Sequence, residues 1–226
     1  MDDPTSLPAL LMEKLDQYPM VQPWSLANDL GPEGVAMEIH RSFAWFAHNY
    51  PDTFFTSSTP TETDTTKILN RKWHPGYASA FRRSVLEDIG GLFEEGLIGS
   101  GDFHMLMGLY NKAELSIKDG VHPNYRKAVL EWQQRAQEVT HGRFGYLDLT
   151  IDHAFHGFKL HRQYESRKQI LVDEQFDPET FAYKNADSVW EFHDTAQTQR
   201  IKERIIEYFR SRNEDIAILE TMEFKP

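Results

Sequence analysis

Asp102, His153 and His156 are the residues whose types and spacing suit a chemical role. Asp102 directly follows the glycine-rich stretch 99–101, where glycine lets the backbone and a ligand approach closely. His153 and His156 are three residues apart. A positioned carboxylate can take a proton from a hydroxyl group, and a pair of imidazoles can bind a divalent metal ion.

Basic side chains follow the histidine pair closely along the chain. The segment contains Lys159, His161, Arg162, Arg167 and Lys168. Arginine and lysine can offset the charge that develops on a diphosphate leaving group. A solvated helix and turn without a role in binding is the alternative, and the sequence leaves both interpretations open.

The elements that must position these residues alternate between helix and strand. Apolar residues at helical spacing predict helices at 10–18, 82–89, 102–109, 123–139 and 195–213. Strand patterns occupy 20–24, 76–81 and 147–153. Residues 31–34 form a predicted turn, and residues 51–67, rich in Ser, Thr and Pro, form a predicted mobile loop. The sequence therefore predicts an α/β protein.

Asp102 is predicted to lie at or near the start of a helix. The preceding short helix ends at Gly90-Gly91, where glycine can adopt the left-handed cap conformation. The amino terminus of a helix carries partial positive charge, which favours an ionised carboxylate. A purely structural helix cap is the alternative role for Asp102. His104 is expected on the surface of the helix rather than in a site.

The histidine pair ends a strand pattern in which apolar and polar residues alternate from 147 to 153. Residues three apart on a regular strand point to opposite faces. His153 and His156 therefore reach one ion only if the strand ends or bends between them, and Gly157 is consistent with such a break. A half-buried strand histidine and an exposed histidine are the other interpretations.

The composition disfavours several classes of protein. The 226 residues include 35 acidic and 24 basic side chains, a formal charge of -11, which opposes binding to a phosphate backbone. The chain has no cysteine, no run of about 18 apolar residues and no signal-peptide pattern. We therefore expect a cytoplasmic protein with no membrane span and no nucleic-acid partner. Aromatic residues make up 13% and include five Trp, whose rings could stack on a sugar.

The order of elements around Asp102 resembles a known enzyme family. A strand, a short helix, Gly90-Gly91, a loop, Gly-x-Gly-Asp and a second helix follow one another across 73–112. This order resembles the acceptor-side module of A-type glycosyltransferases of the family 2 and galactosyltransferase-like kind. The resemblance covers 20–214 and is most specific at 73–112 and 153–178.

The resemblance implies a single glycosyltransferase-like domain over 1–226, with an incomplete A-type glycosyltransferase fold. This fold is a mixed sheet flanked by helices that lacks the amino-terminal nucleotide-binding half. The family's Asp-x-Asp motif, which holds the metal, belongs to that half. Asp2-Asp3-Pro4 is not expected to replace the motif, because no strand precedes it. A missing amino-terminal segment or a partner chain is therefore expected to bind the donor.

The resemblance also implies an activity, the transfer of a sugar from a nucleotide-sugar donor to a glycan or another hydroxyl acceptor with inversion. Asp102 matches the family's general base. His156 matches the late metal ligand best and His153 second, with Mn2+, or Mg2+, as the ion. The basic residues that would contact the donor diphosphate are Lys159, Arg162 and Arg167. The residues that would contact the acceptor are Trp73, Tyr77, Gly99 and Gly101.

Two other functions remain open at this point. The chain could be a noncatalytic carbohydrate-binding or assembly module that presents Trp24, Trp73 and Tyr77. It could also be a small metallohydrolase built on His153 and His156 with a nearby aspartate, Asp148 or Asp152. Strand alternation argues against the metallohydrolase, because its ligands must converge on one ion.

Overall fold

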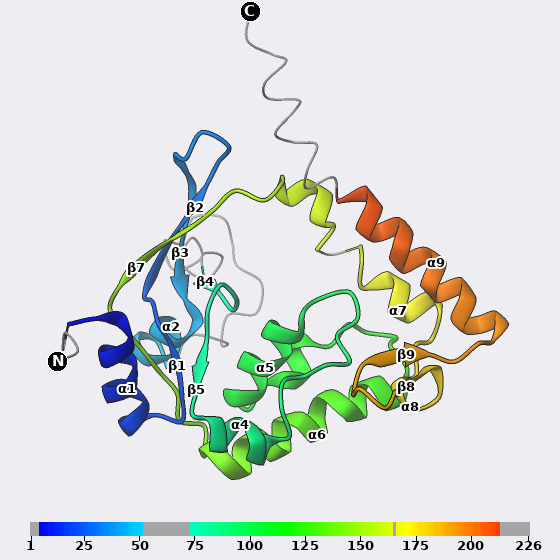
Figure 1. Ribbon diagram of the computed structural model, residues 1–226, viewed down its shortest axis with the longest axis horizontal. Helices are drawn as coiled ribbons and strands as arrows, with labels where there is room; N and C mark the ends of the chain where they lie inside the picture. Colours follow the sequence, from blue (N-terminus) through cyan, green and yellow to red (C-terminus); the bar gives the residue numbers. More distant parts are fainter. Residues whose placement is uncertain (1–4, 52–72, 165, 213–226) are drawn as a thin grey trace, which may run out of the picture. The chain divides into compact units, whose positions relative to one another are not determined.

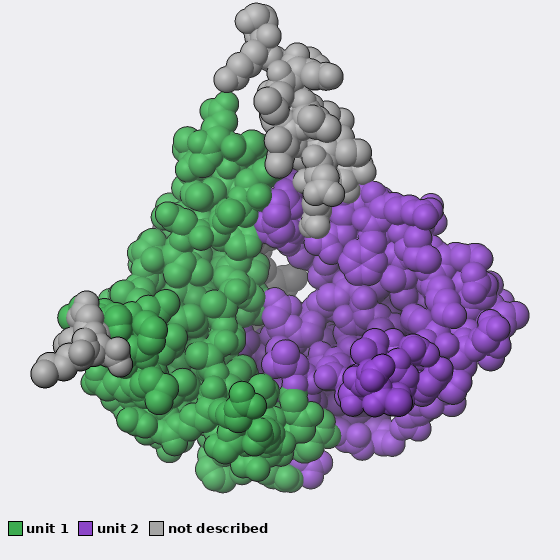
Figure 2. All heavy atoms as spheres, viewed as in Figure 1, with its two compact units in different colours: residues 1–91, 135–155 green, residues 92–134, 156–226 purple. Residues whose placement is uncertain are grey.

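The computed structural model describes residues 5–51, 73–164 and 166–212, and their helices and strands form a mixed α/β protein, as the sequence predicts (Figure 1). The chain divides into two compact units (Figure 2). Unit 1 comprises residues 1–91 and 135–155, and unit 2 comprises residues 92–134 and 156–226. The predicted loop 51–67 lies, from residue 52 onward, outside the described residues. The single domain and its A-type fold stay predictions.

Unit 1 contains two small sheets. The first has the order β5-β1-β6, with β5 (Ala80–Phe81) antiparallel and β6 (Gly145–Tyr146) parallel to β1 (Met20–Gln22). The second has the order β4-β3-β2-β7. Its strands are β4 (Trp73–His74), β3 (Ala36–Ser42), β2 (Leu26–Leu30) and β7 (Thr150–His153).

Strands β2 and β3 form an antiparallel hairpin, which Figure 1 shows with β7 beside β2. The predicted turn at 31–34 joins them. Gly34 has φ +74° and its N–H donates to the carbonyl of Gly31 at 3.0 Å. The register shifts between Asp29 and Leu30, an irregularity of the kind that redirects side chains near sites.

Three helices complete unit 1: α1 (Leu7–Gln17), α2 (Phe43–Asn49) and α4 (Arg83–Ile89). Helix α1 packs through Leu15 against Val21 of β1. Helix α2 begins at Ser42, whose side chain accepts from the N–H of Trp45 at 3.0 Å, a standard helix cap. The core of the unit contains Met20, Val21, Trp24, Phe43 and Phe46, all buried. Burial of such large side chains stabilises the fold by about 1.5–3 kcal/mol each.

Unit 2 is mainly helical. Its elements are α5 (Gly101–Leu109), η1 (Ala113–Ser116), η2 (Lys159–Arg162), α7 (Gln169–Asp173), α8 (Pro178–Phe181) and α9 (Ala196–Ser211), with the antiparallel pair β8 (Ala182–Lys184) and β9 (Trp190–Phe192). Helix α6 (Pro123–Thr140) begins in unit 2 and ends in unit 1. Within the described residues, no helix combines the length and apolar composition needed to cross a bilayer.

The predicted helices all form, but the three predicted strands are shorter than expected, and the segment 20–24 contributes only β1. The segment 76–81 contributes only β5, because Tyr77 takes the left-handed backbone conformation at φ +70°, which interrupts an extended strand. The alternating segment 147–153 contributes only β7, from Thr150. Alternation thus located the strand and its sheet face but not its first residue.

Candidate functional site

Asp102 lies in the first turn of α5, as the sequence predicts. Two residues with positive φ precede the helix, Gly99 at +94° and Ser100 at +73°. The Asp102 carboxylate accepts a hydrogen bond from the backbone N–H of Phe103 at 2.9 Å. The turn therefore holds an acidic side chain at the positively polarised end of the helix.

The surroundings of Asp102 change its acidity. The side chain reaches solvent, yet protein surrounds it, and this desolvation raises the pKa of Asp102 above the ordinary aspartate value. The N–H of Phe103 and the charges of Arg167 and Lys168 act in the opposite direction, and desolvation dominates. A carboxylate with a raised pKa holds a proton more tightly, which suits a general base better than an ordinary surface aspartate.

Arg167 is fixed beside the glycine turn. A Cβ atom on Gly99 would lie 3.0 Å from Nη2 of Arg167, so only glycine leaves the guanidinium its full space. Arg167 donates through Nη1 to the hydroxyl of Tyr208 at 3.0 Å, and its guanidinium lies over the ring of Tyr164, 4.8 Å from the centroid. Lys168 lies 5.2 Å from the ring centroid of Phe103.

The remaining basic residues of the predicted donor site also belong to unit 2. Arg162 donates to the hydroxyl of Tyr164 at 3.2 Å and to the carbonyl of His156 at 3.3 Å. Lys159 begins the same short helix, η2. Asp102, His156 and the basic segment thus share one compact unit, and their predicted roles stay predictions.

His104 was expected on the surface of the helix, and this prediction is wrong. It is buried, and its ring nitrogens lie 2.6 Å from Oγ of Ser116 and 3.2 Å from the hydroxyl of Tyr125. Desolvation, aided by the charge of Lys168, lowers the pKa of His104 to about 3. The imidazole is therefore neutral in the folded protein at neutral pH and links α5 to its neighbours.

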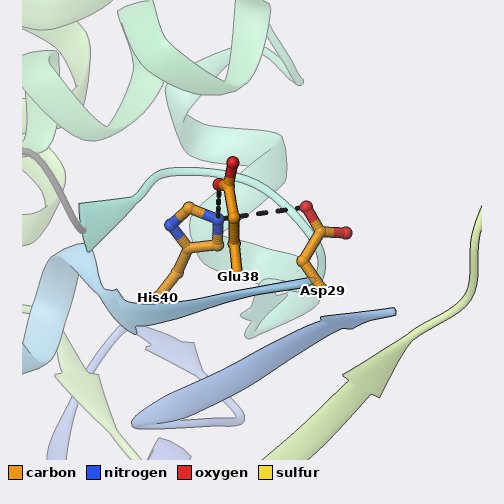
Figure 3. A group of neighbouring side chains, drawn as sticks. All are labelled: Asp29, Glu38 and His40. Carbon is orange, nitrogen blue, oxygen red and sulfur yellow. Dashed lines mark ion pairs between the residues drawn. The ribbon is translucent and has the colours of Figure 1, made fainter. Parts of the chain in front are cut away.

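A second group of polar side chains lies on the four-stranded sheet of unit 1. Asp29 pairs directly with Glu38 in the β2–β3 register and with His153 in the β2–β7 register. His40 lies two residues beyond Glu38 and therefore projects from the same face. The group of Asp29, Glu38 and His40, shown in Figure 3, is called the hairpin cluster below.

The side chains of the hairpin cluster approach closely. Nε2 of His40 lies 3.1 Å from Oε2 of Glu38 and 3.9 Å from Oδ2 of Asp29 (Figure 3). The other carboxylate oxygen of Asp29, Oδ1, lies 2.9 Å from Nδ1 of His153. Because a carboxylate only accepts, His153 must carry a proton on Nδ1 to make this bond. Asp29 and His40 are largely buried, whereas Glu38 is half-exposed.

Aromatic rings border the hairpin cluster. The ring of Tyr77 stacks on His74, with 4.0 Å between centroids and 8° between planes, and lies 4.2 Å from the ring of His153. His74 in turn lies 5.6 Å from His40. Tyr77, predicted to bind the acceptor, is thus a neighbour of this group. Trp73 is half-buried and contacts Phe43, with 5.1 Å between ring centroids.

The two histidines predicted as metal ligands fall in different units, His153 in unit 1 and His156 in unit 2. Of the alternative metallohydrolase set, Asp152 and His153 leave opposite faces of β7. Asp152 accepts from Nδ2 of Asn28 at 2.9 Å, on the opposite sheet face from the bond between Asp29 and His153. The alternation of β7 therefore separates the members of that set.

Trp24, predicted to offer its ring to a glycan, lies in the core. It is fully buried, its ring centroid lies 5.4 Å from that of Tyr77 with the planes tilted by 56°, and its Nε1 donates to the carbonyl of Ala78 at 3.3 Å. A ring inside the core has no face available to a sugar. The prediction that Trp24 belongs to the acceptor surface is therefore wrong.

Comparisons of the chain with protein-family models, with curated proteins and with solved structures find no match in any of the three. The function must therefore be argued from the residues and their geometry.

Proposed function

We propose that the chain is the acceptor-side part of a glycosyltransferase, with Asp102 as the general base that activates the acceptor hydroxyl. The donor is a nucleotide-sugar, and the acceptor is a glycan or another molecule with a free hydroxyl group. The nucleotide-binding half belongs to a further segment or a partner chain. This proposal rests on the resemblance of 73–112 and on the geometry around Asp102.

The reaction is an in-line displacement. The acceptor hydroxyl gives its proton to the Asp102 carboxylate while its oxygen attacks the anomeric carbon of the donor sugar. A bond forms between that oxygen and the anomeric carbon, and the bond from the carbon to the diphosphate oxygen breaks. The nucleoside diphosphate leaves with the bonding electrons, and attack from the opposite side inverts the configuration.

The observation that carries the proposal is the combination of Asp102, the glycine turn before it and the adjacent Arg167. A base must lie within hydrogen-bond reach of the hydroxyl that it deprotonates, and the side chain of Asp102 is exposed at the start of α5, where an acceptor can reach it. The raised pKa of Asp102 increases its affinity for the transferred proton. Arg167 provides a fixed positive charge close to the base, and this charge favours the ionised carboxylate that accepts the proton.

The residues of the basic segment support donor binding. Arg162 and Lys159 lie in η2, next along the chain to His156, which is exposed in the same unit as Asp102. An exposed imidazole fits the role of one late metal ligand, with the other ligands supplied by the nucleotide-binding half. A divalent ion such as Mn2+ or Mg2+, if held by His156 and the other ligands, would offset negative charge on the donor.

A noncatalytic carbohydrate-binding module is the second candidate. Trp73 supports it, because its ring is only partly buried, whereas the ring of Tyr77 is stacked on His74. Partly exposed aromatic faces can stack on the apolar face of a sugar ring. The burial of Trp24 weakens this candidate, since it removes one of the rings on which it depended.

Calorimetric titration of the purified chain with uridine-diphosphate sugars, with and without Mn2+, tests the donor side directly. Binding that requires the metal would mean that the chain keeps part of the donor site. Transfer of labelled sugar to a panel of glycan acceptors is expected once the donor-binding segment or partner chain is supplied. Asp102→Asn should abolish transfer, and Asp119→Asn, an exposed aspartate of the same unit, is the matched control. Glycan binding that a metal chelator does not affect, with no transfer when the donor-binding partner is supplied, would overturn the proposal in favour of the noncatalytic module.

A further inference from the structure

The hairpin cluster in unit 1 has the donor set and spacing of a metal site. It lies in β2 and β3, and neither strand contains Asp102, the predicted base, or His156, the predicted metal ligand. We propose that Asp29, Glu38 and His40 bind one divalent first-row transition-metal cation, with His153 as a positioning residue that orients Asp29. This inference is independent of the proposed sugar transfer.

The distances within the cluster fit a single ion. Ligand atoms at about 2.1 Å from a tetrahedral or octahedral ion lie about 3.0–3.4 Å from one another. Nε2 of His40 and Oε2 of Glu38 are 3.1 Å apart, inside this interval. Oδ2 of Asp29 lies 3.9 Å from the same nitrogen, about 0.5 Å beyond the interval, which a small rotation of a side chain removes. One ligand atom from each residue lies within 4.8 Å of both others.

The strand register makes this arrangement specific. Asp29 and Glu38 are direct partners in the antiparallel pair, so their side chains leave the same face at adjacent points. His40, the partner of Ala27, follows on that face. Like charges directly opposite each other repel, and a divalent cation between two carboxylates replaces that repulsion with attraction to both.

Burial prepares two ligands and leaves the third adjustable. The side chains of Asp29 and His40 are 13% and 10% exposed, whereas that of Glu38 is 53% exposed. Largely buried ligands are held by their surroundings before the ion arrives. Glu38, at the solvent side, can close on the ion after it enters and gives the ion a route from water.

A second layer of contacts orients the ligands. Nδ1 of His153 donates to Oδ1 of Asp29 at 2.9 Å, which directs Oδ2 toward His40. Such outer partners of ligating carboxylates fix their orientation, and their loss typically weakens metal binding about 10- to 100-fold. Tyr77 stacks on His74 and contacts His153 at a tilt of 40°, which limits the movement of both imidazole rings.

The donor set indicates the class of ion. Two carboxylates and one imidazole suit Mn2+, Fe2+, Co2+ or Zn2+, whereas an all-oxygen set would suit Mg2+ or Ca2+. Three protein ligands leave coordination positions open for water or for an oxygen of a small ligand. The cluster is therefore expected to be an open site rather than a closed structural one.

Titration of the full chain with Mn2+ alone, followed by calorimetry and by the electron paramagnetic resonance of free Mn2+, tests the site, and Zn2+ serves as a second probe. We expect one ion per chain. His40→Ala and Glu38→Gln should each weaken binding at least 10-fold. His153→Ala should weaken it by about 10- to 100-fold, the range for loss of an outer partner. His193→Ala, at an exposed position of unit 2, should leave the affinity unchanged.

Glu38→Gln keeps the proposal testable if a buried substitution fails to fold, because its side chain is half-exposed. Circular dichroism of each variant verifies folding. A folded chain that binds neither ion overturns the proposal, and so does binding that depends on His156 but not on His40. Asp102→Asn should not alter the affinity for Mn2+, so failure of the metal site and failure of the transferase proposal are separate outcomes.

Discussion

The turn at Asp102 and the hairpin cluster are two candidate sites built by different kinds of chain geometry. Asp102 is positioned by the residues immediately before it, through the positive φ angles of Gly99 and Ser100. Asp29 of the hairpin cluster meets His153, which is 124 residues away in sequence, through strand pairing. The first site is local and readable from a short motif, whereas the second depends on register. The comparison predicts that each site can be damaged without harming the other.

The largest expected effect is loss of sugar transfer in Asp102→Asn. Removal of a general base typically costs about 10²- to 10⁴-fold in rate, and the amide cannot accept the hydroxyl proton. Transfer by the unsubstituted enzyme should fall as the pH drops through the raised pKa of Asp102, because protonation removes the base. Initial rates across pH measure both effects, with Asp119→Asn as control. Full activity of Asp102→Asn would remove Asp102 from the mechanism.

The same carboxylate gives a stability prediction with a definite sign. Since the pKa of Asp102 is higher in the folded than in the unfolded chain, its contribution to stability is present below the unfolded value and lost as pH rises through the folded value. As the pH rises from the unfolded to the folded pKa of Asp102, the urea concentration at the midpoint of unfolding should therefore fall for the unsubstituted chain relative to Asp102→Asn. Parallel pH dependence of the two proteins would contradict the desolvation of Asp102.

The next largest effect is a change in the pH dependence of stability caused by His104, which also belongs to unit 2. Its pKa falls from 6.5 to about 3 on folding, so the stability it contributes is present above pH 6.5 and is lost as pH falls toward 3. His104→Gln, which can still bond Ser116 and Tyr125, should flatten the decline in the free energy of unfolding between pH 7 and pH 4. Urea titrations at several pH values measure it, with His193→Gln as the exposed control. If the free energy of unfolding of His104→Gln declined with falling pH as steeply as that of the unsubstituted chain, His104 would not be neutral and buried in the folded protein.

Gly99→Ala and Gly91→Ala form a matched pair with a smaller effect. The two glycines have φ +94° and +92°, so alanine at either position should cost about 1–2 kcal/mol of stability from backbone strain. Only the Cβ at position 99 meets Arg167, at 3.0 Å, whereas the one at position 91 meets nothing within 4 Å. Gly99→Ala should therefore also reduce transfer, by displacing the guanidinium. Equal activity of the two variants would remove Arg167 from the site.

The smallest effect is expected at the hairpin tip. Gly34 has φ +74° and open space around it, so Gly34→Ala should cost about 1 kcal/mol from backbone strain alone. Because strand register and not the turn side chain sets the hairpin cluster, its affinity for Mn2+ should change less than 3-fold, and the pH profile of transfer should not change. Thermal unfolding and metal titration measure these outcomes. A large loss of metal binding would show that the tip, rather than register, sets the cluster.

The sequence determined the longer helices and the position of Asp102 at the start of a helix. Helical periodicity located α1, α5, α6 and α9, and Gly90 ended α4 as predicted, because local sterics act through neighbouring residues. The placement of Asp102 in the first turn of α5 followed from the glycines before it. These features depend on contacts a few residues apart, which a pattern in the sequence records.

Only the tertiary structure decided the hairpin cluster, the burial of Trp24 and the burial of His104. The alternation of Glu38 and His40 with apolar neighbours was a signal for a polar strand face, but nothing local pairs Glu38 with Asp29 or Asp29 with His153. Register and burial arise from the packing of distant segments, and a one-residue slip moves a side chain to the other face of a sheet. For this reason composition and periodicity reveal which residues could bind, whereas the fold decides which of them meet.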